Sequence, residues 1–167
     1  MYTADDSMAE NPRNRNAKAA PQEGGRTDEP AIRALIEAWA AAARKGDIER
    51  IMAFYAPDVL AFDAIAALQF RGADAYRKHW QMCIAHMPGG EAIMEVHDLG
   101  IHVSGHLAVA HYLSRCGYTD DQGKEHAGWM RATVCCRRTS DGWRIAHEHY
   151  SLPFDPVSNK ALADLTP

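Results

Sequence analysis

The sequence predicts an α+β fold in which three helices are followed by a long antiparallel sheet. Two observations lead to this prediction. Apolar residues recur at helical spacing through the first half of the chain, and the period changes to two after Pro88-Gly89-Gly90. Turn-forming sequences then divide the second half into strands of similar length. Helices that precede one meander are expected to pack on a single face of a curved sheet.

The three helices are predicted from their apolar stripes and from the residues that begin and end them. The first helix is expected to begin at Asp28, as its N-cap, and to end at Gly46. The second helix begins at Asp47 and continues until Pro57, which cannot extend it. A third helix is expected over about 73–87, where the turn Pro-Gly-Gly ends it.

The strands are predicted from alternating apolar residues between turn sequences. A short apolar run over 59–62 is expected to form a first strand that ends at Asp63. Longer strands are expected near 92–103, 107–119, 127–138 and 143–152.

Length and composition indicate one globular domain. The 167 residues are 47% hydrophobic and 24% charged, which suits a single core. We expect this domain over 28–156, after a disordered leader at 1–27 and before a C-terminal tail at 157–167. The net charge of −4, with no basic cluster larger than Arg137-Arg138, argues against nucleic acid as a partner.

Other sequence features bear on location and cofactors. No apolar run approaches the roughly 18 residues that a membrane span needs, so no membrane association is expected. The four cysteines include no C-x-x-C spacing, and Cys135 and Cys136 point to opposite faces of a strand. Free thiols in a reducing cytoplasm are therefore expected. Neither a G-x-G-x-x-G sequence nor a P-loop occurs, and no cofactor is predicted.

Two groups of motifs stand out, one in each half of the chain. The first group is Gly46-Asp47-Ile48-Glu49-Arg50-Ile51 with Tyr55-Ala56-Pro57-Asp58 and Arg71-Gly72. The second is Arg131-Ala132-Thr133 followed by Asp141-Gly142-Trp143-Arg144-Ile145-Ala146-His147-Glu148-His149-Tyr150-Ser151. They resemble the ketosteroid-isomerase-like, or SnoaL-like, family of the nuclear transport factor 2-like superfamily over about residues 30–156. The second group is also similar to the association domain of calcium/calmodulin-dependent protein kinase II. The resemblance implies a cone-shaped fold, with a curved mixed or antiparallel sheet wrapped around the helices and a central pocket.

Position by position, the resemblance to the isomerases assigns candidate site residues. Asp63 falls where these enzymes keep their general base, and Tyr55 matches a supporting pocket tyrosine. Trp39 and Trp80 stand where they carry two pocket tyrosines, one of them an oxyanion-hole donor, and the oxyanion-hole aspartate should fall near Thr133. Because neither oxyanion-hole donor is kept, steroid isomerisation is not expected. Asp63 itself should lie in the pocket within reach of Tyr55, Trp39 or Trp80, in apolar surroundings without a cation.

The last strand supplies a second set of candidates. Glu148 and Tyr150 alternate with His147 and His149, so the two pairs face opposite sides of the sheet. The resemblance places Glu148 and Tyr150 toward the cavity, together with residues of neighbouring strands: Tyr112, Ser114, Arg131 and Thr133. Arg131 is then the expected partner of Glu148, either as a structural ion pair or as a fork that binds a polar or carboxylate-bearing ligand.

Aromatic and histidine residues leave alternatives open. Trp129, with the aromatic residues at 39, 55 and 80, could form a box for a flat ligand or plain core. His147 and His149, with His111 on an adjacent strand, could hold a metal, but no H-E-x-x-H sequence occurs and no metal is predicted. Hydrogen bonding along the strands or a subunit interface is the better expectation for these histidines.

Two functions of different classes remain. The first is an acid–base isomerase, dehydratase or cyclase that acts on an apolar ligand with Asp63 as base. The second is a non-catalytic module for ligand binding or oligomerisation. In either case, an apolar sheet face that carries His111, Leu113, His147 and His149 would be an unusual surface in water. We therefore expect an isologous homodimer that forms through the sheets.

Overall fold

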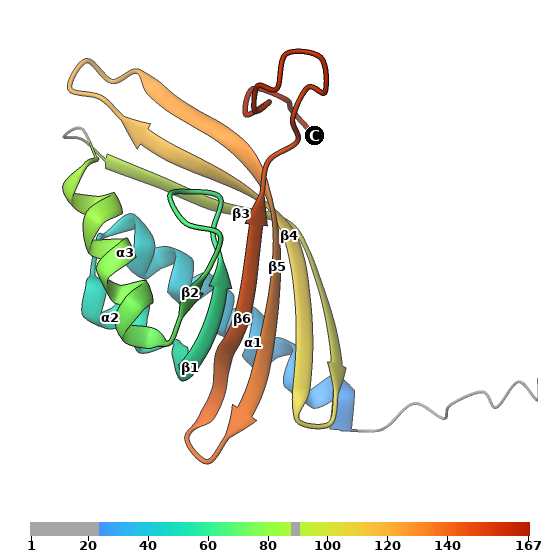
Figure 1. Ribbon diagram of the computed structural model, residues 1–167. Helices are drawn as coiled ribbons and strands as arrows, with labels where there is room; N and C mark the ends of the chain where they lie inside the picture. The colour runs from blue at the N-terminus through green and yellow to red at the C-terminus, as the bar shows by residue number, and fades with distance from the viewer. Residues whose placement is uncertain (1–23, 88–90) are drawn as a thin grey trace, which may run out of the picture.

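The computed structural model describes residues 24–87 and 91–167, and confirms the α+β fold (Figure 1). Most of the predicted leader and the Pro-Gly-Gly turn lie outside these residues. Helix α1 spans Gly24–Arg44 and so begins four residues before the predicted cap. Asp28 lies within the helix, where its carboxylate forms an ion pair with Arg138 instead of capping.

The second and third helices begin where the sequence places them. Helix α2 spans Ile48–Met52, and the Asp47 side chain accepts a hydrogen bond from the Arg50 N–H at 3.0 Å. Helix α3 spans Ala73–Ala85. The prediction that α2 continues to Pro57 is wrong. Tyr55 begins a strand instead, because sheet pairing with Ile145 extends the backbone there.

Six strands form one mixed sheet. They are β1 (Tyr55–Phe62), β2 (Phe70–Arg71), β3 (Glu91–Ser104), β4 (Leu107–Thr119), β5 (Glu125–Thr139) and β6 (Gly142–Ser151). Their order across the sheet is β2-β1-β6-β5-β4-β3, and only the β1–β6 pair is parallel. The four long strands agree with the predicted ranges to within two residues, whereas β2 was not predicted.

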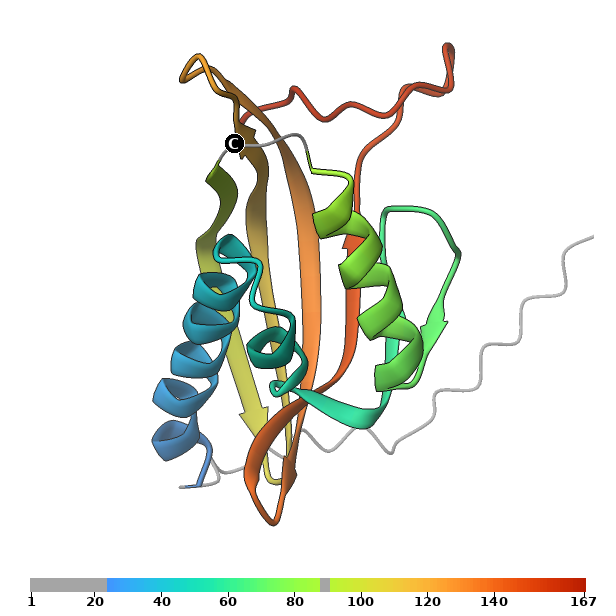
Figure 2. The same ribbon diagram turned by 90° about the vertical axis from the view of Figure 1, so that its left-hand side faces the viewer.

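The helices cover one face of this curved sheet (Figures 1 and 2). Helix α1 packs along β3, whereas α3 lies over β1 and β2. The core between helices and sheet includes large buried residues of both layers: Ile32, Ile36, Trp39, Ile51, Val59, Tyr76, Val134 and Ile145. None of the described helices is long and apolar enough to cross a membrane.

The segment after β6 packs back on the sheet. Phe154 and Ala161 form an isolated bridge, and the Trp129 N–H of β5 donates a hydrogen bond to the Ala163 carbonyl at 2.9 Å. The predicted tail at 157–167 therefore contacts the domain through β5.

Candidate functional site

A cavity of about 220 Å³ opens between α1, α3 and the concave face of the sheet. Its wall is mostly apolar and includes side chains of both layers: Trp39, Ala43, Trp80, Met87, Ile93, Met94, Met130 and Tyr150. Asp63 and His79 are the acidic and basic groups that line it. Trp39 and Trp80 meet edge to face, with ring centroids 6.0 Å apart. A cavity thus lies where the family resemblance predicts a pocket.

Asp63 follows directly after β1 and lies in the pocket wall with its side chain 15% exposed. Its Oδ1 accepts a hydrogen bond from the Ile65 N–H at 3.0 Å. Its Oδ2 accepts one from the Tyr76 hydroxyl at 3.0 Å and lies 3.2 Å from His79 Nε2. The side-chain partners of Asp63 are thus Tyr76 and His79 of α3 rather than Tyr55, Trp39 or Trp80, and the imidazole of His79 can carry a positive charge.

Sequence reasoning missed His79 as a site residue. The imidazole is buried against two rings, with centroid distances of 4.1 Å to Phe70 and 5.7 Å to Tyr76. Its Nε2 also lies 3.6 Å from the Cys83 sulfur. The signal that could have found it is helical spacing, because positions 76, 79, 80 and 83 share one face of α3.

Glu148 of β6 is fully buried behind Asp63 and has hydroxyl partners. The Tyr55 hydroxyl donates to its Oε2 at 2.9 Å, and the Tyr76 hydroxyl contacts its Oε1. The Trp39 Nε1–H donates in turn to the Tyr55 oxygen at 2.9 Å. Burial raises the pKa of Glu148 to about 7, although the hydrogen bonds from Tyr76 and Tyr55 oppose this shift.

The prediction that Arg131 and Thr133 face the cavity with Glu148 is wrong. In the β5–β6 ladder Val134 pairs with Glu148, and Thr133 pairs with His149. Paired residues share a face, so Thr133 and Arg131 lie on the outer face and are exposed. Arg131 therefore lies across the sheet from the Glu148 carboxylate and cannot neutralise it.

The remaining aromatic candidates divide between the two faces. Tyr112 and Tyr150 are buried on the helix side, where their hydroxyl oxygens lie 2.7 Å apart, and Tyr150 stacks on Trp39. Trp129 lies on the outer face, with its ring centroid 4.9 Å from that of His97, and does not line the pocket. The buried Trp80 Nε1 has no hydrogen-bond partner among the described residues.

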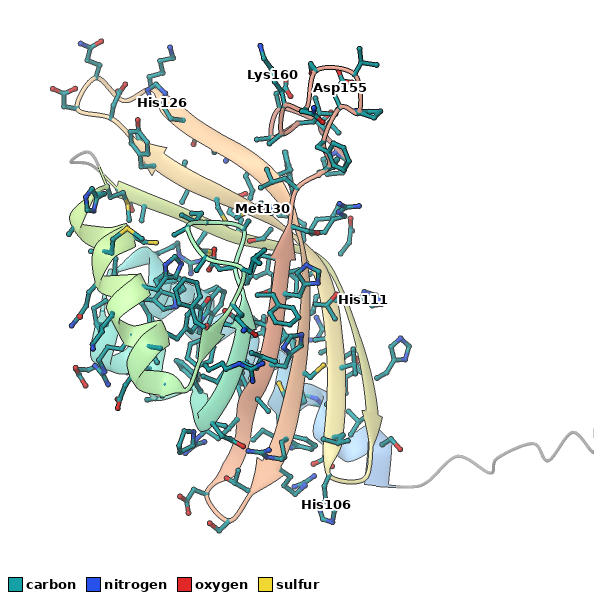
Figure 3. All side chains as sticks on the ribbon, viewed as in Figure 1. His106, His111, His126, Met130, Asp155 and Lys160 are labelled. Atoms are coloured by element: carbon teal, nitrogen blue, oxygen red, sulfur yellow. The ribbon has the colours of Figure 1, made fainter. Side chains whose placement is uncertain are left out.

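The described part of the chain contains no group of three or more His, Cys, Asp or Glu side chains that could hold a metal ion. His111 points away from the helices (Figure 3) and is exposed. His147 Nδ1 instead lies 2.7 Å from the Leu60 carbonyl oxygen, and Phe62 packs edge-on against both His147 and His149.

The curved sheet, the three helices and the pocket between them define a nuclear transport factor 2-like fold. The chain belongs to the SnoaL-like domain family, whose family model matches residues 32–155. It is 48% identical to an NTF2-like protein of unknown function from Pseudomonas putida KT2440, with a TM-score of 0.79. That alignment covers 85% of this chain and 98% of the other.

More distant structures share the fold. One, from Streptomyces avermitilis, is described as a candidate dehydratase of the NTF2-like family: it is 19% identical, with a TM-score of 0.67 and coverage of 75% of this chain and 96% of its own. Another, from Xanthomonas campestris, is described as a candidate calcium/calmodulin-dependent protein kinase II association domain: it is 21% identical, with a TM-score of 0.57 and coverage of 72% and 84%. Comparison with curated proteins gives no match.

Proposed function

We propose that the pocket is the active site of a cofactor-independent acid–base enzyme, an isomerase or lyase that acts on a small apolar ligand. The observation that carries the proposal is the contact between Asp63 and His79 in a mostly apolar wall. A carboxylate and an imidazole in contact provide a base and an acid for proton transfer at neutral pH. The description of a relative as a candidate dehydratase agrees with this class of reaction.

In the proposed reaction, Asp63 takes a proton from an activated carbon of the ligand. The Tyr76 hydroxyl and the Ile65 N–H keep the carboxylate oriented toward the cavity. For a dehydration, the protonated His79 imidazole gives a proton to the leaving hydroxyl as the C–O bond breaks. The products are an alkene, water, a protonated Asp63 carboxyl group and a neutral imidazole. For an isomerisation, Asp63 returns the same proton to another carbon.

The walls of the pocket favour a compact, flat ligand. The volume of about 220 Å³ lies below the range of roughly 300–1,000 Å³ that is usual for drug-sized ligands. Trp39, Trp80 and Tyr150 offer aromatic surfaces, and Met94 and Met130 can adapt to the edges of a ring.

A combined thermal-shift and turnover screen tests the proposal. Small cyclic ketones and hydroxy-ketones are the probes, and wild type, Asp63→Asn and His79→Asn are the proteins. We expect a probe that stabilises all three proteins but is converted by wild type alone. Asp58→Asn is the matched control, because Asp58 is exposed on β1 and pairs with Arg137 outside the pocket. Conversion that survives in Asp63→Asn would overturn the base assignment.

The alternative function remains a non-catalytic binding or oligomerisation module. The likeness to a candidate kinase association domain is the observation that favours it. If probes bind to wild type and to Asp63→Asn with equal affinity, and none is converted, this second function replaces the first.

We also propose an isologous homodimer that forms through the outer face of the sheet. This face carries exposed or half-buried residues of three neighbouring strands: His111, Leu113, Thr133 and His149. Light scattering at tens of micromolar protein should give twice the chain mass, and Leu113→Glu should reduce it to one chain. A monomeric mass for wild type would exclude the dimer.

A reducing, cytoplasmic location is supported by the four cysteines, which are all free thiols.

A further inference from the structure

We propose that Glu148 and Asp63 share one proton through the Tyr76 hydroxyl, and that the buried Glu148 thereby sets the protonation state of the carboxylate in the pocket. The inference rests on the proposed function, because it gives Asp63 the role of base. It goes beyond that function by assigning Glu148 and Tyr76 as positioning residues that act through Asp63.

The hydroxyl groups near Glu148 have too few hydrogens for all of their contacts with ionised carboxylates. The Tyr55 oxygen accepts a hydrogen bond from the Trp39 indole, so its own hydrogen is available for Glu148. The Tyr76 hydroxyl has one hydrogen but contacts both Glu148 Oε1 and Asp63 Oδ2. If both carboxyl groups were ionised, one of these two contacts would bring two oxygens together with no hydrogen between them.

One added proton satisfies every contact. A protonated Glu148 donates to the Tyr76 oxygen, and Tyr76 then donates to Asp63. The surroundings place this proton on Glu148 rather than on Asp63. Asp63 has two further stabilising partners, the His79 imidazole and the Ile65 N–H, whereas no cation contacts Glu148 in the described structure. Full burial without a cation favours the neutral acid, which agrees with the raised pKa of Glu148.

The same contacts provide a path for transfer. The Glu148 O–H bond breaks as the hydrogen joins the Tyr76 oxygen, and the original Tyr76 hydrogen moves to Asp63 Oδ2. The step leaves a Glu148 carboxylate, an Asp63 carboxylic acid and an unchanged Tyr76. Asp63 is therefore a base while Glu148 holds the proton and becomes an acid after the transfer, without a proton from water.

The other groups around Glu148 do not compete for this proton. The titratable groups that face it are Tyr55 and Asp63 from the β1 side, Tyr76 from α3, Tyr112 from β4, Cys136 from β5 and Tyr150 from β6. Burial raises the pKa of each of these tyrosines and of the Cys136 thiol, so they remain neutral between pH 5 and 8. Helix α1 contributes Trp39, which does not titrate.

Infrared difference spectroscopy of the full chain tests the shared proton without any ligand. Between pH 5 and 8, wild type should lose a carboxylic-acid C=O band with a midpoint near 7, and Glu148→Gln should lack this band. Asp63→Asn should move the midpoint down, because it removes a neighbouring negative charge. Tyr76→Phe should also move it, because it removes the hydroxyl that joins the two carboxyl groups. Glu37→Gln, exposed on α1, should leave it unchanged.

Two results would overturn the proposal. One is a band that persists in Glu148→Gln or is absent from wild type at pH 5. The other is a midpoint that neither Asp63→Asn nor Tyr76→Phe moves, which would show that the carboxyl groups are independent. If Glu148→Gln does not fold, the two remaining variants decide the question. Loss of the proposed function would appear separately, as unchanged conversion in the Asp63 and His79 variants.

Discussion

Replacing Glu148 with glutamine should change how the stability of the fold depends on pH. The glutamine amide resembles the protonated acid, because its oxygen can accept from Tyr55 and its N–H can donate to the Tyr76 oxygen. Glu148→Gln therefore fixes the neutral state of this position at every pH. Wild type must either keep a proton on Glu148 or bury a carboxylate among hydroxyl groups.

The size of the effect follows from the pKa of Glu148 in the two states. The folded value of about 7 lies above the ordinary value of 4.5. Each unit corresponds to about 1.4 kcal/mol, so the shift amounts to about 3 kcal/mol. Because the folded pKa is raised, this stability is fully present below pH 4.5. It is lost progressively as pH rises through the folded pKa, and then no further.

Chemical denaturation from pH 5 to pH 8.5 measures this difference. The difference in free energy of unfolding, Glu148→Gln minus wild type, should increase by up to about 3 kcal/mol as the pH rises across this range. The control variant Glu37→Gln should follow the wild-type curve, because its side chain is exposed on α1. Parallel curves for wild type and Glu148→Gln would refute the titration of a buried acid at this position.

Four further predictions concern packing and reactivity. Gly117→Ala should lower the free energy of unfolding by about 2 kcal/mol or more, because its Cβ would lie 2.0 Å from a backbone oxygen of the neighbouring strand. Gly100→Ala should cost less in the same denaturation assay, since the obstacle is an exposed histidine ring that can move; equal costs would contradict this. Trp39→Phe should cost about 2 kcal/mol through the lost hydrogen bond to Tyr55 and the lost volume, and an unchanged denaturation midpoint would argue against that bond. Burial raises the pKa of Cys83 to about 11, so its alkylation by iodoacetamide at pH 7.5 should be about a hundredfold slower than that of a free cysteine, and rapid labelling by mass spectrometry would contradict this.

Local signals were sufficient for most of the fold. The β3–β4 turn at Ser104-Gly105 and the β5–β6 turn at Ser140-Asp141-Gly142 are short, and their residues determine both where each strand ends and where the next begins. Helix ends were predicted well where a cap supplies a side-chain bond, as at Asp47. The errors fall where distant segments decide the structure. Tyr55 joins the sheet through a parallel pairing with β6 that no short-range pattern encodes.

The site was predictable in position but not in its contacts. The resemblance placed Asp63 at the end of the first strand, and it lies in the pocket wall there. Its partners come from α3, whose orientation over β1 depends on the packing of the whole layer. The prediction of the sheet face on which Arg131 lies was wrong. A difference of one residue in the pairing of two strands exchanges the two sides of the sheet.

The position of Arg131 on the outer face has a chemical consequence for the pocket. An arginine beside Glu148 would have held this carboxylate ionised throughout the physiological range, because a guanidinium does not lose its proton. With Tyr55 and Tyr76 as partners, the stabilisation comes from neutral hydroxyl groups, which can serve the acid as well as the carboxylate. A buried acid in this environment changes charge near neutral pH. The surroundings of Glu148 thus favour a group that exchanges a proton over one that only maintains a fixed charge.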